Sequence, residues 1–582
     1  MSVATLKYKY SNYSILVSGV LAIIISWYFK WSYTEYPLNF MGGDAKDYYS
    51  GLVSTFITHD LTNQSGNDWF LLKTNGGTIN VHPIGVSILL LPFFALASLF
   101  AALFHFPLDG YSFPFQFSVA FAALFYALAG LVYLKKSLRL HTISDKTTGL
   151  VILLLFLGTN LLHYTVSEAG MSHVYSFSLI SVFLYHSAKF VMYRQNRNLL
   201  FSFLIMGLIV LVRPNNILIL LSIFMWFKNS EECKSFFKDL FKNKAFYKAL
   251  TFSAFIVLLQ SMVWFIQSKS LFHNTYVADG FYWLDPQVLK MLFGFDGGFF
   301  IYTPLCLLFL AGLVFMYKEN RFSFFAAVLF LAGLFYFFAS YWAYTYFDGL
   351  GIRVLVDYYA LLSFFGAKFF EHFLGRMMVY NSLMMFAGIL LVINLVYSYQ
   401  ANRGILLRAG MTYTKWKYIF LKTGTEYIDV LGGSNELKPY SPKKQEVILE
   451  REIKFEKPFD YSRQDYGLAL AFDSVGFHSN RIQIKIDCSR KELFLNASKD
   501  AMLCVALEDG KTHEGKFYTQ FRLNEAPATE CCQTKAYHYT SNISADFKPE
   551  DKLSVFLWNT KKQAFLIDKF SVQVYNYSFK IN

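Results

Sequence analysis

Long apolar segments separated by short polar connections make up the first two-thirds of the chain. Runs of about 20 apolar residues match the length of a helix that crosses the hydrocarbon core of a bilayer. The pattern therefore predicts about eleven spanning helices. Their expected ranges are 12–32, 113–134, 147–166, 172–190, 198–212, 214–228, 248–267, 298–317, 322–342, 353–371 and 378–398.

The apolar run 85–105 is the exception, because its length permits a span but the distribution of charge argues against one. With this run excluded and the N-terminus inside, the inner connections carry nineteen Lys and Arg residues and the outer ones carry seven. If the run crossed the membrane, every later connection would change sides and the bias would collapse. We therefore expect a re-entrant or interfacial helix within a long outer loop, 33–112.

The pattern changes from about residue 430, where segments such as RIQIKID, AMLCVALED and KLSVFLWN alternate apolar and polar residues between turn signals. This alternation is typical of half-buried strands and predicts an all-β sandwich. The expected fold is a mainly α, polytopic membrane protein with a C-terminal all-β sandwich. We expect a membrane domain over 1–400, a connector over 401–430 and a sandwich over 431–582, with the sandwich on the outer side.

Composition agrees with a membrane protein and narrows the function. Of the 582 residues, 55% are hydrophobic, 19% aromatic and only 16% charged, with a formal net charge of +13. Much of the positive excess lies in the inner connections, where it sets orientation, and no nucleic-acid motif accompanies it. The first apolar stretch lacks a small-residue cleavage site, so we expect it to remain as a helix. The C-terminal cysteines Cys488, Cys504, Cys531 and Cys532 leave disulfide pairing open.

Acid, His and Arg side chains gather on the outer connections. They include Asp44, Asp47, Tyr48, His82, Glu168, His173, Arg213, Asn215, Asp279, Asp285, Asp296, Asp348, Arg353 and Asp357. Polar groups at membrane depth usually line a cavity or a substrate path. An Arg suits a phosphate, and a nearby carboxylate can take a proton from an incoming hydroxyl. The set predicts a transferase that attacks a sugar carbon and releases a lipid phosphate.

Each of these residues also has a purely structural interpretation. An ionisable group near the interface can snorkel or pair locally. Asp357 falls four residues after Arg353 and could be its ion-pair partner, and Asp47 could orient a helix over 47–58. Tyr48 could be an aromatic residue of the membrane interface.

Several segments resemble the GT-C superfamily of polyprenyl-phosphate-sugar-dependent glycosyltransferases, in particular protein O-mannosyltransferases and bacterial lipid A aminoarabinose transferases. The resemblance covers roughly residues 10–400. The segments that carry it are GGDAKDYYSGL, VHPIGVSILLLPFF, LIVLVRPNNILILL, FGFDGGFFIYTPLCLLFLAGL and YFDGLGIRVLVDYYALLSFF. The histidine-proline segment and its apolar helix close the first outer loop in many bacterial members, which agrees with an interfacial 85–105.

The resemblance implies roles for residues at the matching positions. Asp44 matches the catalytic acid of the first loop, and Glu168 matches an acid of the second. Arg353, in the Gly-x-Arg segment, is the first candidate for the donor phosphate, and Arg213 is the second. The remaining expected substrate-binding residues are Asp47, Tyr48, His82, His173, Asp348 and Asp357.

The resemblance implies an inverting transferase with a polyprenyl-phosphate sugar as donor and a protein, lipid or glycan as acceptor. We expect no obligatory cofactor, although a divalent metal held by His82, Glu168 and His173 is left open. The expected location is a bacterial inner membrane, with a cytoplasmic N-terminus and a periplasmic sandwich. Two other classes compete: a transporter or flippase of a lipid-linked sugar, and a glycan-binding assembly factor. A transporter would favour inverted repeats and helices broken at the midplane, which the sequence does not indicate.

Overall fold

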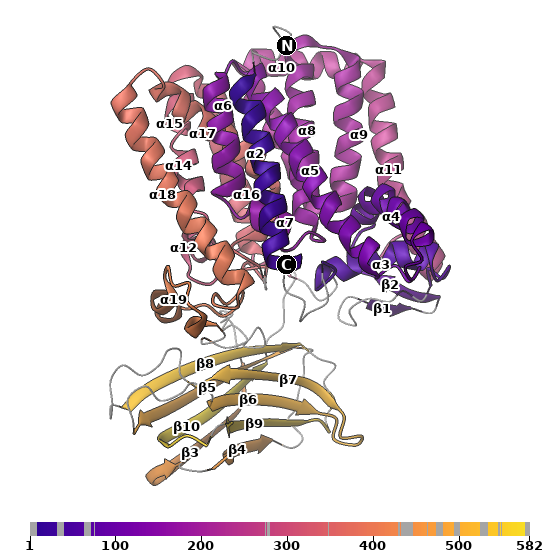
Figure 1. The fold of residues 1–582 in the computed structure, drawn as a ribbon. Coiled ribbons are helices and arrows are strands. Elements are labelled where there is room, and N and C mark those ends of the chain that lie inside the picture. The colour runs from indigo at the N-terminus through magenta and orange to yellow at the C-terminus, as the bar shows by residue number, and fades with distance from the viewer. Residues whose placement is uncertain are drawn as a thin grey trace. The chain divides into compact units, whose positions relative to one another are not determined.

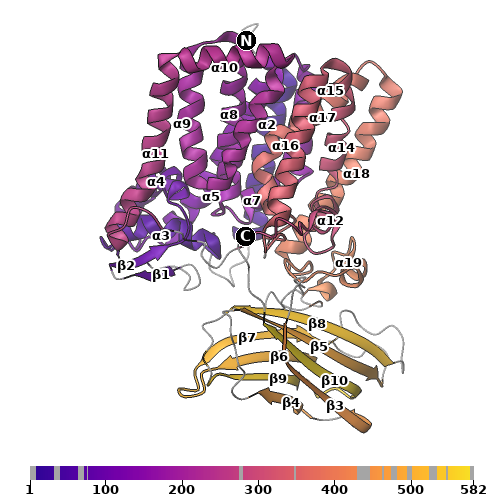
Figure 2. The ribbon, with the colours of Figure 1, turned by 180° about the vertical axis from the view of Figure 1, so that it is seen from behind.

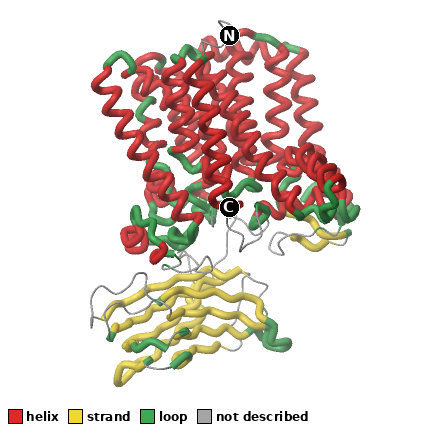
Figure 3. The backbone as a smooth tube through the Cα atoms, in the orientation of Figure 1, coloured by secondary structure: helices red, strands yellow, loops and turns green. Residues whose placement is uncertain are grey.

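The computed structural model divides into two compact units, one of residues 1–293, 298–346 and 350–398, the other of residues 294–297, 347–349 and 399–582. The first is helical, and the second holds most of the strands (Figures 1 and 3). The structure describes residues 8–31, 40–62, 64, 71–74, 76–273, 275, 280–346, 349–428, 431, 446–461, 464–472, 481–493, 501–523, 534–544, 548, 550–560 and 562–576.

Helices of the first unit follow the apolar segments of the sequence, and one short hairpin lies among them. The elements are α2 (Lys9–Ser26), η1 (Trp27–Trp31), α3 (Asp44–Phe56), β1 (Leu71–Thr74), β2 (Gly77–Asn80), α4 (Gly85–Leu103), α5 (Phe113–Leu140), α6 (Asp145–Leu157), α7 (Leu161–Val166), α8 (Ser172–Tyr193), α9 (Asn196–Val212), η3 (Pro214–Trp226), α10 (Ser230–Lys242), α11 (Lys244–Ser268), α12 (Val288–Phe293), α13 (Phe299–Tyr302), α14 (Leu305–Leu310), α15 (Leu313–Glu319), α16 (Arg321–Ser340), η4 (Arg353–Tyr358), α17 (Tyr359–Phe373) and α18 (Met377–Asn402).

Within the described residues, seven helices are long and apolar enough to cross a membrane, so the predicted eleven are not confirmed. Six of the seven fall on predicted spans, and α4 is the seventh. The other predicted spans are shorter or interrupted. The segment 147–166 is split into α6 and α7, and 298–317 is split into α13, α14 and α15. Pro214 separates α9 from η3, because a proline disfavours the helical conformation of the residue before it.

By length and composition, α4 could also cross a membrane. In Figures 1 and 2 it stays at the end of the helical unit that holds α3, whereas α5, α8 and α9 run along that unit. It packs against α3 and α5. An interfacial α4 remains a prediction, and the arrangement of the helices is compatible with it.

The second unit contains two four-stranded antiparallel sheets, with strand orders β3-β10-β5-β8 and β4-β9-β6-β7. Apolar side chains from both sheets form one core, which is the predicted sandwich. In β5, Ile482, Ile484 and Ile486 are buried at every second position, as the alternation predicts. The elements are α19 (Tyr413–Ile419), η5 (Thr425–Tyr427), β3 (Glu446–Asp460), β4 (Tyr466–Phe472), β5 (Arg481–Glu492), β6 (Ala501–Glu508), β7 (Gly515–Arg522), β8 (Thr534–Ser544), β9 (Lys552–Asn559) and β10 (Phe565–Asn576).

Cys488 and Cys504 are buried in these sheets as free thiols. The Tyr518 hydroxyl lies 3.2 Å from the Cys504 sulfur. Cys531 and Cys532 lie outside the described residues. The described cysteines of the sandwich therefore contribute to its core rather than to a disulfide.

Candidate active site

An ion pair joins the start of α3 to the start of η4. The Arg353 Nη1 atom lies 2.9 Å from the Asp44 Oδ2 atom, and the two side chains are 16% and 19% exposed. Asp44 begins α3 and Arg353 begins η4, so both charges are held at helix ends. A carboxylate in the first turn of a helix is favoured by the helix dipole. The structure thus brings together the predicted base and the first predicted phosphate ligand, which are about 300 residues apart.

The residue before Asp44 fixes how α3 begins. Gly43 has φ +58° and ψ −142°, a backbone conformation that is open almost only to glycine. A Cβ added at Gly43 would meet nothing within 4 Å, so there is no close approach of another group at this position. Gly43 therefore sets the direction in which the backbone enters α3 at Asp44.

A second cluster is centred on Asp357, whose side chain is fully buried. His173 Nδ1 lies 2.9 Å from its Oδ1 atom, and Asn216 donates from Nδ2 to its Oδ2 atom at 2.7 Å. Arg213 Nε lies 3.4 Å from the same Oδ2 atom. Asp357 thus pairs with Arg213 and His173, and the local Arg353–Asp357 pair considered from the sequence is not formed. The Asn of the Arg-Pro turn that contacts it is Asn216, and the sequence interpretation named Asn215.

Ser172 and Tyr48 link the two clusters. Arg213 donates from Nη1 to the Ser172 hydroxyl at 3.1 Å, and Tyr48 lies within electrostatic reach of Arg213, Asp44 and Arg353. Tyr48 is 5% exposed and packs edge-on against the His82 ring, with ring centroids 4.7 Å apart. It is therefore a buried residue of the site, and the alternative of an aromatic at the membrane interface does not hold.

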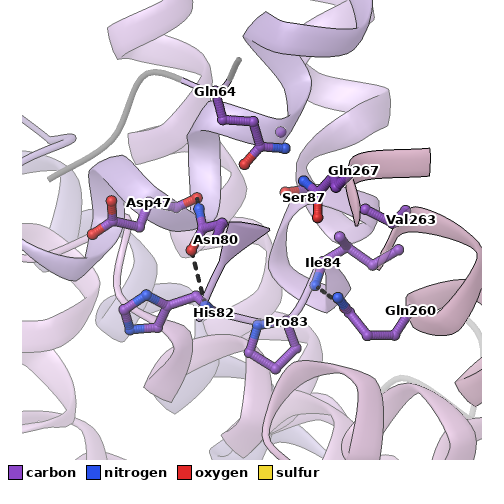
Figure 4. Close-up of a pocket in the computed structure, with 11 residues that line it drawn as sticks. Asp47, Gln64, Asn80, His82, Pro83, Ile84, Ser87, Gln260, Val263 and Gln267 are labelled. Carbon is purple, nitrogen blue, oxygen red and sulfur yellow. Dashed lines mark hydrogen bonds between the residues drawn. The ribbon is translucent and has the colours of Figure 1, made fainter. Parts of the chain in front are cut away.

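Asn80, at the end of β2, holds the loop that carries His82 against α3. It donates from Nδ2 to the Asp47 carbonyl at 2.8 Å, and its Oδ1 atom accepts from the His82 N–H at 2.9 Å. These residues border a small polar pocket beside α11, where Gln260 Oε1 accepts from the Ile84 N–H at 2.8 Å. In Figure 4 the side chains of Asp47 and His82 point to one side, away from Gln260. Asn80 is thus a positioning residue that the sequence interpretation missed.

Glu168 lies between α7 and α8 and has a partner that the sequence interpretation did not name. Its Oε1 atom is 3.4 Å from His163 Nε2, and the Glu168 side chain is 11% exposed. The Ser398 hydroxyl lies 3.4 Å from the other nitrogen of His163, Nδ1. A histidine inside an otherwise apolar segment is the signal that could have identified this partner.

Charges around Asp44 keep it ionised. Burial alone would raise the pKa of Asp44, but Arg353, with smaller contributions from His82, His173 and Arg213, holds that pKa below its ordinary value. For His82, burial lowers the pKa to about 4, so this imidazole is neutral near pH 7. Two of the groups that act on Asp44, His173 and Arg213, belong to the Asp357 cluster, so Asp44 lies within electrostatic reach of that cluster.

Asp348 and the possible metal ligands are the remaining residues that the sequence singled out. Asp348 falls outside the described residues. Within the described part of the chain, no group of three or more His, Cys, Asp or Glu side chains is placed to hold a metal ion. His173 is engaged by Asp357 and Glu168 by His163, so the structure does not gather His82, Glu168 and His173 as metal ligands.

No protein-family model and no curated protein sequence matches this chain. The chain is similar to the apo oligosaccharyltransferase of Archaeoglobus fulgidus with a TM-score of 0.42 and 13% identity, over 71% of this chain and 57% of that one. It is similar to AglB of the same organism, in complex with an inhibitory peptide and a dolichol-phosphate, with a TM-score of 0.38 and 12% identity over 70% and 57%. For the arabinosyltransferase EmbB of Mycobacterium smegmatis, the TM-score is 0.30 and the identity 10%, over 96% and 67%. The chain thus spans little more than half the length of the archaeal enzymes, and scores this low assign it neither a fold family nor an activity.

Proposed function

We propose that this chain is an integral-membrane glycosyltransferase that moves a sugar from a polyprenyl-phosphate donor to an acceptor hydroxyl. The observation that carries the proposal is the Asp44–Arg353 pair, in which a base and a phosphate-binding group are in contact while each stays partly exposed. The motif resemblance to the GT-C superfamily supports the same assignment. The inverting outcome follows from a single displacement.

In the proposed reaction, the acceptor oxygen attacks the anomeric carbon while the bond from that carbon to the phosphate oxygen breaks. Asp44 takes the acceptor proton, and the leaving lipid phosphate keeps the bonding electrons. Arg353 neutralises the charge that develops on this phosphate, which its planar guanidinium suits. The chain's own residues supply both roles, and no obligatory metal is proposed.

Donor binding would also activate the base. In the structure Arg353 stabilises the Asp44 carboxylate and lowers its pKa, and a base of low pKa is weak. A donor phosphate competes with Asp44 for the same guanidinium. Once Arg353 turns to the phosphate, the pKa of Asp44 rises and the carboxylate becomes a better proton acceptor.

Arg213 is proposed as a second, weaker contact for the donor phosphate. Asp357, His173 and Asn216 fix its position through the buried contacts described above.

Glu168, with Tyr48 and His82, is proposed to bind the sugar or the acceptor at the same end of the helical unit. This end and the sandwich are proposed to lie on the periplasmic side of a bacterial inner membrane, and the positive-inside distribution of charge supports that orientation. The sandwich is proposed as an accessory domain.

The test uses the full-length protein in nanodiscs with a mixed pool of polyprenyl-phosphate sugars and follows the release of free polyprenyl phosphate. Asp44→Asn and Arg353→Ala are compared with the wild type and with Asp109→Asn. Asp109 caps the exposed turn before α5, so this control removes one negative charge outside the site. We expect release by the wild type and by Asp109→Asn, and loss of at least about 100-fold in the two site variants. Binding of lipid without release by the wild type would favour a transporter or a binding protein.

A further inference from the structure

A second cleft lies at the opposite end of α8 from His173. Its volume is about 630 Å³, and its lining comes from the start of α2, the C-terminal end of α5 and the C-terminal part of α8. Because a helix rises about 1.5 Å per residue, Lys189 on α8 lies roughly 24 Å along the helix from His173. In Figure 1 this is the end of the helical unit that carries the N-terminus, and α3 is at the other end. The cleft is therefore separate from the candidate active site.

Four cationic side chains line this cleft: Lys135, Lys136, Arg139 and Lys189. No carboxylate is among the lining residues that the structure describes. Asp145 lies outside the lining but acts electrostatically on Lys135, and it accepts from the Tyr10 N–H at 2.8 Å and from the Ser11 hydroxyl at 2.6 Å. Four cations with at most one carboxylate acting on them still repel one another, and a bound anion would relieve that repulsion.

Tyrosine rings lie against all four cations of the cleft. Lys136 Nζ lies 4.3 Å from the Tyr133 ring centroid and 6.0 Å from that of Tyr185, and Lys189 Nζ lies 5.4 Å from the Tyr185 centroid. Lys135 Nζ and Arg139 Cζ lie 6.0 and 5.3 Å from the Tyr8 ring centroid, and these two side chains also donate hydrogen bonds to the Asn12 side chain and to the Ile143 carbonyl. Lys136 and Lys189 therefore keep their ammonium protons available for a ligand.

We propose that this cleft binds the phosphate-bearing head group of an anionic membrane lipid in the inner leaflet. The volume is in the range of small-ligand sites. The cleft is formed by the ends of three helices that are long enough to cross a membrane, α2, α5 and α8, so it lies where head groups are expected. Tyrosines at helix ends and basic pockets between spanning helices are the features that this kind of lipid recognition uses. The inference does not depend on the glycosyltransferase assignment.

The test measures the thermal unfolding midpoint of the full-length protein in a neutral detergent while a phospholipid is titrated. Phosphatidylglycerol is the anionic probe, phosphatidylcholine is the zwitterionic one, and inorganic phosphate tests a soluble anion. Lys136→Gln/Lys189→Gln is compared with Lys234→Gln/Lys248→Gln, which removes the same charge from exposed positions at the same end. Lys136→Arg/Lys189→Arg keeps the charge and reports on folding.

We expect phosphatidylglycerol to raise the midpoint of the wild type, because a ligand that binds only the folded state stabilises it. The Lys136→Gln/Lys189→Gln variant should need about 30-fold more lipid, at about fivefold for each lysine. The control pair and the arginine pair should respond as the wild type does. An equal response of both glutamine pairs would overturn the cleft as the site. Saturation by inorganic phosphate, with no further shift from the lipid, would overturn the lipid as the ligand.

Discussion

Replacement of Asp357 tests whether the site is built around a buried carboxylate. Asp357 is fully buried and contacts His173, Asn216 and Arg213. In Asp357→Asn the remaining oxygen can still accept from His173. Asn216 can turn its amide, because its Oδ1 atom has no partner among the described residues and can accept from the new amide. What this variant loses is chiefly the charge opposite Arg213, so we expect a loss of about 1.5–3 kcal/mol in the free energy of unfolding.

Asp357→Ala removes every contact and leaves the Arg213 cation without its partner. Loss of one member of a buried ion pair typically costs about 3–5 kcal/mol, so alanine should be clearly worse than asparagine. Both values are measured by denaturant titration of the purified full-length chain in one detergent. The exposed control Asp109→Asn should change the free energy of unfolding by less than about 0.5 kcal/mol.

A double-mutant cycle isolates the ion pair itself. Arg213→Gln should cost less in the Asp357→Asn background than in the wild type, with a coupling energy of about 1–3 kcal/mol. A coupling energy of zero would refute the reasoning, because the 3.4 Å contact would then contribute nothing to stability. A wild-type value for Asp357→Ala would refute the burial argument as a whole.

Two further perturbations test the site from other directions. Gly43→Ala should lower the free energy of unfolding by about 1–3 kcal/mol, because alanine is strained at this φ and ψ, and it should also lower polyprenyl phosphate release. Gly42→Ala is the matched control, because the φ of Gly42 is not positive. Equal effects of the two substitutions would contradict the role given to Gly43. Burial of His82 lowers its folded-state pKa to about 4, below its value in the unfolded chain, so the unfolded state takes up the proton first as the pH falls. Stability should therefore decline between pH 6.5 and pH 4 by up to about 3 kcal/mol, measured as the unfolding midpoint against pH, and His82→Gln should flatten that decline; an unchanged slope in the variant would contradict the assignment. Asp44 adds its own loss as the pH falls from its ordinary carboxyl pKa to its depressed folded-state pKa, because the unfolded chain takes up that proton first.

Sequence patterns predicted the elements of this chain better than the partners of its charges. The alternation in β5 and β6 predicted the sandwich because a half-buried strand has a fixed period of two. The Arg353–Asp357 pair, which the sequence left open as an alternative, does not form for a geometric reason. Residues four apart share a face of an α-helix, but η4 is a 3-10 helix with three residues per turn. The two side chains therefore diverge, Arg353 toward Asp44 and Asp357 toward Arg213.

Other contacts of the site depend on packing between distant segments. Asn80 positions His82 through hydrogen bonds to α3, and Ser172 accepts a hydrogen bond from Arg213. Neither residue belongs to a charged motif, so no local pattern distinguishes it from an ordinary polar residue. The predicted span count is not confirmed where helices break within the described residues. Segments such as 298–317 have the apolar length of a span, but the structure divides them into short helices.

The most direct measurement separates the roles proposed for Asp44 and Arg353 by changing the acceptor. Azide needs no base to become a nucleophile, whereas a hydroxyl acceptor does. Single-turnover reactions with a polyprenyl-phosphate sugar are followed for polyprenyl phosphate release and glycosyl azide formation. If the account is right, Asp44→Ala fails with hydroxyl acceptors but forms glycosyl azide of inverted configuration, while Arg353→Ala is impaired with both. Wild-type transfer to a hydroxyl acceptor by Asp44→Ala would contradict the central claim.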